Sequence, residues 1–127
     1  MRTRLIQRSG NEAGSYYVEH FWLPFVGPTM LLLWQRLCEY ALAGSDVTLE
    51  QLHRELGIGR DRVAHSLERL QSFGLLELQG NDVLVKSAIG NLSESRVERL
   101  VPRLREAHQR DWPTAEDYKA ERAAAPA

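Results

Sequence analysis

The feature that most restricts the fold of this chain is a pair of leucine-striped segments joined at two glycines. Apolar residues recur at helical spacing on both sides of Gly57 and Gly59. Glycines one residue apart allow a tight turn, so the pattern predicts two short helices that pack their apolar faces together. The apolar positions are Leu49, Leu52 and Leu56 before the turn and Val63, Leu67 and Leu70 after it.

Capping and turn residues set the limits of these two helices. Thr48 and Gln51 stand three residues apart, as in the capping box that begins a helix. Gly74 has the position of a glycine that ends one. Two short runs of strand-forming residues follow, 75–79 and 83–86, on either side of a turn. We therefore expect a β-hairpin directly after the second helix.

An aromatic segment, Tyr16–Pro28, precedes this region and contains two Tyr, two Phe and one Trp. Its prolines, Pro24 and Pro28, exclude one continuous helix. Rings at this density must be buried, either against the same domain or against a second subunit. Residues 29–43 then show helical periodicity, with Pro28 suited to the first turn and Gly44 to the end.

The two flanks of the chain differ in composition. Residues 1–15 mix arginines with small polar residues and predict a flexible basic arm or an edge segment. Residues 16–112 are expected to form a single domain, which closes with a helix over Val97–Trp112. Ser95 and Glu98 form a capping-box pair for that helix, and Pro102 kinks it or divides it in two. Residues 113–127 predict a disordered tail.

Residues 47–86, VTLEQLHRELGIGRDRVAHSLERLQSFGLLELQGNDVLVK, resemble the winged helix-turn-helix domains of bacterial regulators. The aromatic segment and the helix after it are similar in layout to the N-terminal domain of DnaD-type replication initiation proteins. The resemblance implies a mainly α fold with a small β-hairpin, an α+β fold. In it, a winged helix carries an N-terminal aromatic and helical extension and a C-terminal helix. It also implies DNA binding, with the second helix in the major groove and the hairpin as the wing.

Arginine, histidine and serine on the second helix have the chemistry that such binding needs. Arginine forms paired hydrogen bonds with guanine, and histidine and serine donate to bases or phosphates. The first backbone amides of a helix also bind phosphate. The alternative is an ordinary solvated helix face. The candidate DNA-binding residues are Arg60, Arg62, His65, Ser66 and Arg69 on the helix and Asn81 and Lys86 on the hairpin.

The charge balance does not favour strong DNA binding. The chain has a formal net charge of −1, so a nucleic-acid site must be a local patch. Residues 44–90 contain five basic and seven acidic side chains, and Asp82 at the hairpin turn opposes phosphate. Further cations lie outside this segment, at Arg2, Arg4 and Arg8 before it and at Arg96, Arg99, Arg103, Arg105 and Arg110 after it.

No pattern of catalysis or cofactor binding is found in the sequence. The four histidines are far apart, and Cys38 has no second ligand at metal-binding spacing. The glycines of the turn lack the strand and lysine of a phosphate-binding loop. We therefore expect no enzymatic activity, no metal and no cofactor. A single cysteine, with no apolar run suited to a signal peptide or membrane span, favours the cytoplasm.

Two functional hypotheses follow. The first is a cytoplasmic, homodimeric transcription regulator that binds double-stranded DNA with the helix Arg60–Phe73. Its dimer surfaces are the aromatic segment and the helix Val97–Trp112, unless these pack within the chain. The second is a winged-helix interaction module of a replication or transcription complex, which docks a protein partner through Tyr16–Phe25 and binds little or no DNA. The acidic balance and the dense aromatics favour the second hypothesis.

Overall fold

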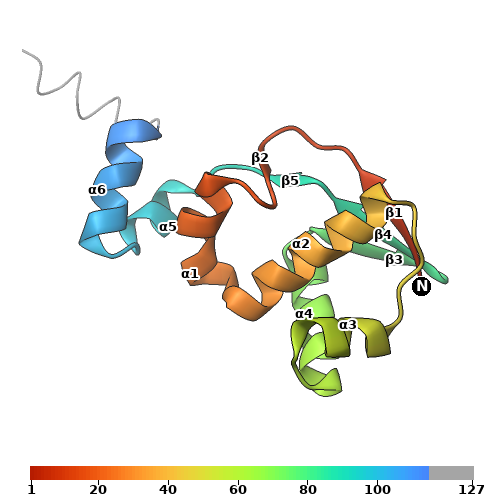
Figure 1. Cartoon of the computed structure of the whole chain (residues 1–127). Coiled ribbons are helices and arrows are strands. Elements are labelled where there is room, and N and C mark those ends of the chain that lie inside the picture. The colour runs from red at the N-terminus through yellow and green to blue at the C-terminus, as the bar shows by residue number, and fades with distance from the viewer. Residues whose placement is uncertain (115–127) are drawn as a thin grey trace, which may run out of the picture.

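The computed structural model describes residues 1–114 of the 127 in the chain. It is mainly helical with a small sheet, which is the expected α+β class (Figure 1). From residue 115 on, the tail predicted for 113–127 lies outside the described residues. The elements are β1 (Arg2–Ile6), β2 (Asn11–Glu12), the π-helix η1 (Val18–Trp22), α1 (Leu23–Val26), α2 (Pro28–Leu42), α3 (Leu49–Leu56), α4 (Arg60–Ser72), β3 (Leu76–Gln79), β4 (Asp82–Lys86), β5 (Ala88–Ile89), α5 (Glu94–Glu98) and α6 (Pro102–Asp111).

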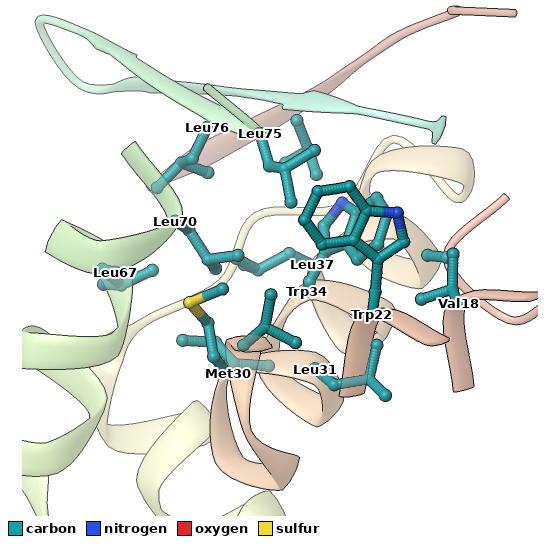
Figure 2. Close-up of a cluster of buried hydrophobic side chains, with 14 of the residues drawn as sticks. Val18, Trp22, Met30, Leu31, Trp34, Leu37, Leu67, Leu70, Leu75 and Leu76 are labelled. Atoms are coloured by element: carbon teal, nitrogen blue, oxygen red, sulfur yellow. The ribbon is translucent and has the colours of Figure 1, made fainter. Parts of the chain in front are cut away.

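Helix α2 forms the centre of the molecule. It crosses the middle of Figure 1, between the sheet and the pair α3–α4, while α5 and α6 lie at the end away from the sheet. Leu33 and Leu37 on this helix are fully buried. Figure 2 shows side chains from α2, α4, β3 and the aromatic segment meeting in one cluster. The helix begins at Pro28 and ends before Gly44, whose φ is 65°, as the sequence predicts.

The two helices and the turn between them are confirmed. The Thr48 side chain accepts a hydrogen bond from the Gln51 amide at 3.1 Å, and the Gln51 side chain accepts one from the Thr48 amide at 2.8 Å. Gly57 adopts the left-handed conformation that ends α3, with φ 67°. His53 Nδ1 is hydrogen-bonded to the Ile58 carbonyl and closes the turn. These local contacts fix where α4 starts relative to α3.

The larger sheet has three strands in the order β1-β4-β3, and β2 and β5 form a separate antiparallel pair. Strands β3 and β4 form the predicted antiparallel hairpin, and β1 pairs with β4 in parallel from Arg2 opposite Asp82 to Ile6 opposite Lys86. Of the two alternatives for residues 1–15, a flexible arm or an edge segment, the chain therefore has the edge segment, as strand β1. Strand formation is favoured because Thr3 is buried and donates a hydrogen bond to the Ser45 carbonyl, while Leu5 packs against the core.

The aromatic segment packs within the chain. Tyr17, Phe21 and Trp22 are at most 4% exposed, and the segment bends at Gly27, whose φ is 82°. These side chains are therefore unavailable to the protein partner or the second subunit predicted for Tyr16–Phe25. Of the large apolar residues in that range, Tyr16 alone is widely exposed, at 60%.

The C-terminal helix is divided in two, and Pro102 begins the second part. The cap of α5 is Ser93, whose hydroxyl accepts from the Arg96 amide, so the predicted Ser95–Glu98 capping box is wrong by two residues. Val101 is 60% exposed, because it precedes Pro102 as the cap of α6. None of the helices within residues 1–114 is both long and apolar enough to cross a bilayer.

Candidate nucleic-acid interface

Helix α4 presents one cationic face to solvent. Arg62, His65 and Arg69 are three and four residues apart and therefore lie along one side of the helix. Arg62 and His65 are exposed, and Arg69 is half-buried. Within residues 1–114, no carboxylate lies at ion-pair distance from either arginine. The buried side of the helix consists of Val63, Ser66, Leu67 and Leu70.

Ser66 is not part of this face. Its side chain is 5% exposed, so its prediction as a DNA contact is wrong. The reason is positional: Ser66 stands three residues after Val63 and four before Leu70, inside the apolar stripe. Its small side chain fits there, and its polarity alone does not bring it to the surface.

Arg60 forms an ion pair with a carboxylate of the same chain. Its Nε lies 2.7 Å from one oxygen of Glu50, and a terminal nitrogen lies 3.0 Å from the other. Hydrogen bonding by Arg60 lowers the pKa of Glu50 below its ordinary value, and the same contact raises the pKa of Arg60. Arg54 Nε also contacts Glu50, at 3.0 Å. Arg60 therefore joins α3 to α4 at the surface, and DNA must compete with Glu50 for it.

The two hairpin candidates lie in different places. Asn81 is exposed at the turn, where its carbonyl accepts from the Arg2 amide at 3.0 Å. Lys86 is the last residue of β4, at the end away from the turn. Its side chain lies beside Gly74, where an added Cβ would be 3.8 Å from its Nζ. That position suits a cation because it is the C-terminal end of α4, where the helix dipole is negative. Lys86 and Arg60 are thus at opposite ends of a helix about 20 Å long.

Strand β1 places Arg2 and Arg4 beside the hairpin. The sequence did not predict that these cations lie there. Arg2 and Arg4 are exposed, and each is paired in register with a residue of β4. Arg2 lies opposite Asp82, the residue that disfavours phosphate at the turn. Thr3 is buried between the exposed Arg2 and Arg4, which is the alternation of a strand. In the sequence this alternation covers few residues and gives only a short signal.

Two hollows lie away from the α4 face. One, of about 370 Å³, is lined partly by Glu12, Glu19 and Glu39. The other, of about 320 Å³, is a mainly apolar groove that includes Leu23 and Leu31. No residue of α4 lines either hollow. In the part of the chain that the structure describes, no group of three His, Cys, Asp or Glu side chains is placed to hold a metal ion.

Comparison with known proteins gives a structural likeness and no sequence family. No family model and no curated protein matches the chain. Among solved structures, it is similar to the primosome protein DnaB (residues 1–300) from Geobacillus stearothermophilus, with a TM-score of 0.52 and 18% identity. The likeness covers 99% of this chain and 51% of the other, so this chain spans about half the length of the chain that it matches. At this identity the likeness shows the fold alone.

Proposed function

We propose that this chain is a winged-helix protein that binds duplex DNA with the exposed face of α4. The observation that carries the proposal is the stripe of Arg62, His65 and Arg69, in which neither arginine has a carboxylate partner among residues 1–114. The order of α3, turn, α4 and hairpin supports it, because the second helix of such an arrangement enters the major groove. We further propose a homodimeric, cytoplasmic transcription regulator that acts by binding, without catalysis, metal or cofactor.

Each side chain has a definite part in this binding. Arg62, near the start of α4, reads a base edge, since a guanidinium fits the paired acceptors of guanine. Arg69, near the end, contacts phosphate. At the hairpin turn, Asn81 and the adjacent Arg2 approach the DNA backbone. Arg60 contributes only when DNA phosphate displaces Glu50. Lys86 lies at the end of α4 where Arg69 is, away from the hairpin turn.

Substitution of the arginines tests the proposal. A duplex is first selected from a random pool, and its affinity is then measured by fluorescence anisotropy over a series of salt concentrations. Arg62→Ala is expected to weaken binding by about 1–3 kcal/mol and to relax sequence preference, whereas Arg69→Ala weakens binding to all sequences and flattens the salt dependence. The control is Arg103→Ala, which removes the same charge from an exposed position on α6. Equal losses in all three variants contradict the proposal.

A second candidate is an interaction module for a replication complex, with little DNA binding of its own. The likeness to a primosome protein favours it, and so does the apolar groove beside α1 and α2, where Leu32 is 49% exposed. This candidate replaces the first if no duplex is retained from the pool even at low salt. A surface substitution in the groove, Leu32→Ser, is then expected to abolish partner binding while Arg62→Ala leaves it unchanged.

A further inference from the structure

The guanidinium of Arg96 lies among three aromatic rings. Its Cζ is 5.1 Å from the ring centroid of Trp22, 5.9 Å from that of Phe25 and 5.8 Å from that of Phe73. The rings come from η1, α1 and the residue that ends α4, whereas Arg96 belongs to α5. Attraction between the cation and the ring faces fixes the position of the guanidinium. Three separate parts of the chain, residues 18–26, the end of α4 and α5, therefore meet at this one charge.

The Arg96 guanidinium has no acceptor among the described residues. Arg96 is half-buried, and its printed hydrogen bond to Ser93 uses the backbone amide, not the side chain. Within residues 1–114, no carboxylate lies at ion-pair distance from it. A guanidinium has five N–H donors, and no nitrogen of Arg96 is a buried atom without a partner, so these donors remain accessible from solvent. The ring faces attract the cation, but they leave those donors available to an anion.

A second arginine approaches the same rings. Arg99 Cζ lies 5.7 Å from the Phe25 centroid, and its Nε donates to the Ser95 carbonyl at 3.4 Å. Arg96 and Arg99 are three residues apart and share a side of the helical turn, while the carboxylates of this segment, Glu94 and Glu98, share another. Two like charges around one ring repel each other, and an anion between them removes that repulsion.

This cluster adjoins the cationic face of α4. Phe73 follows Arg69 by one helical turn, and its amide donates to the Arg69 carbonyl at 3.0 Å. The stripe of Arg62, His65 and Arg69 therefore leads to the ring that Arg96 contacts. We name Arg96, Arg99, Phe25 and Phe73 the Arg96 patch. Positive charge extends from the α4 face into this patch on a second element.

We propose that the Arg96 patch binds the sugar-phosphate backbone of duplex DNA, next to the segment that the α4 face contacts. The inference rests on the proposed function, because it requires the α4 face to bring DNA alongside. Phosphate suits the patch, since guanidinium groups pair with its oxygens in a bidentate manner. The half-buried rings of Phe25 and Phe73 contact the sugars. The patch supplies cations that the acidic segment 44–90 lacks.

A matched pair of exposed arginines provides the test. Arg99→Gln and Arg103→Gln remove the same charge four residues apart, and both positions are exposed. The full chain is titrated with a labelled 20-base-pair duplex of random sequence and with a single strand of the same length, over a series of salt concentrations. Arg99→Gln is expected to weaken duplex binding about fivefold and to reduce the salt slope by about one, as for one lost phosphate contact. Arg103→Gln is expected to bind like the unaltered chain.

Arg96→Gln extends the test, and its thermal unfolding is followed because it also removes the contacts with the rings. If that variant does not fold, Arg99→Gln still decides the outcome. Unchanged duplex affinity in Arg99→Gln, with a loss in Arg62→Ala, overturns the inference and leaves the proposed function standing. A loss confined to the single strand also overturns it. If the unaltered chain binds neither probe at low salt, the proposed function and the inference both fail.

Discussion

The two ends of the molecule are stabilised in different ways. At the end formed by η1 and α6, Phe21 lies 5.1 Å from Tyr17, 5.0 Å from His108 and 5.2 Å from Trp112, measured between ring centroids. At the end formed by α3 and α4, contact between the helices is aliphatic, and the polar contacts are exposed ion pairs such as Arg60 with Glu50. The first end is therefore held by buried rings, and the second combines a small aliphatic core with surface charge.

This difference indicates where sequence can vary without loss of the fold. Exposed ion pairs contribute little to stability, because water screens them and long side chains lose freedom when they pair. The charges on α4 are therefore not needed to hold that helix in place. The charged residues of α4 can therefore be selected for binding without loss of the fold. The buried rings of the aromatic end cannot be replaced in this way, because they hold that end together.

The largest effect is expected at the aromatic end. Phe21→Ala is predicted to lower the free energy of unfolding by about 3–5 kcal/mol, because a fully buried ring is replaced by a cavity. Denaturation in urea measures this, and the control is Tyr16→Ala, at an exposed neighbouring ring. Similar losses for the two variants would mean that the buried rings do not stabilise this end of the molecule.

A smaller effect is expected from one buried hydroxyl. Tyr17 Oη accepts from the Leu92 amide at 2.8 Å and hydrogen-bonds His108 Nε2 at 2.7 Å. Tyr17→Phe removes both bonds and is predicted to cost about 1–3 kcal/mol, because the two partners stay buried without that oxygen.

The same hydroxyl predicts a dependence on alkaline pH. Burial raises the pKa of Tyr17 above its ordinary value of 10.0. An unfolded chain releases this proton at lower pH than the folded chain, so the stability from Tyr17 is complete below pH 10 and declines as pH rises above it. Unfolding measured from pH 8 to 11 is expected to show a weaker decline in Tyr17→Phe. An identical decline in both proteins contradicts this assignment.

The smallest change in stability, with a gain in binding, is expected at the charged end. Glu50→Gln removes the carboxylate that holds Arg60 and is predicted to leave the unfolding transition nearly unchanged, because the pair is exposed. DNA affinity is predicted to rise, since Arg60 is released and one negative charge is lost. Glu39→Gln is the control, because it removes an exposed carboxylate from α2. Weaker DNA binding in Glu50→Gln contradicts the placement of DNA beside α4.

Features determined by neighbouring residues could be predicted from the sequence. The cap of Thr48 and Gln51 and the glycines at the helix ends depend on hydrogen bonds that close within a few residues. The helical period placed Arg62 and His65 on the exposed side of α4 for the same reason. Ser66 was predicted wrongly because its hydroxyl suggests a surface position, whereas its place in the apolar stripe of α4 buries it.

Features that join distant segments could not be predicted. Strand β1 pairs with β4 across about eighty residues, and five residues alone carry little strand signal. The hydrogen bond between Tyr17 and His108 also joins segments that are far apart in the sequence. The burial of His108 could not be predicted, because a single histidine on a helix does not indicate its partner. Arg60 is paired by a residue of the preceding helix, and the rings around Arg96 come from three elements. The cationic face was therefore predicted only in part.

The most direct test of the DNA-binding proposal is an NMR titration of the ¹⁵N-labelled chain with the selected duplex. If DNA binds as proposed, amide signals shift along the exposed side of α4, at Arg62, His65 and Arg69, and at Arg96 and Arg99. Signals at the α1–α2 groove, including Leu31 and Leu32, are expected to stay in place. Shifts confined to that groove, or none at low salt, would contradict DNA binding by the α4 face.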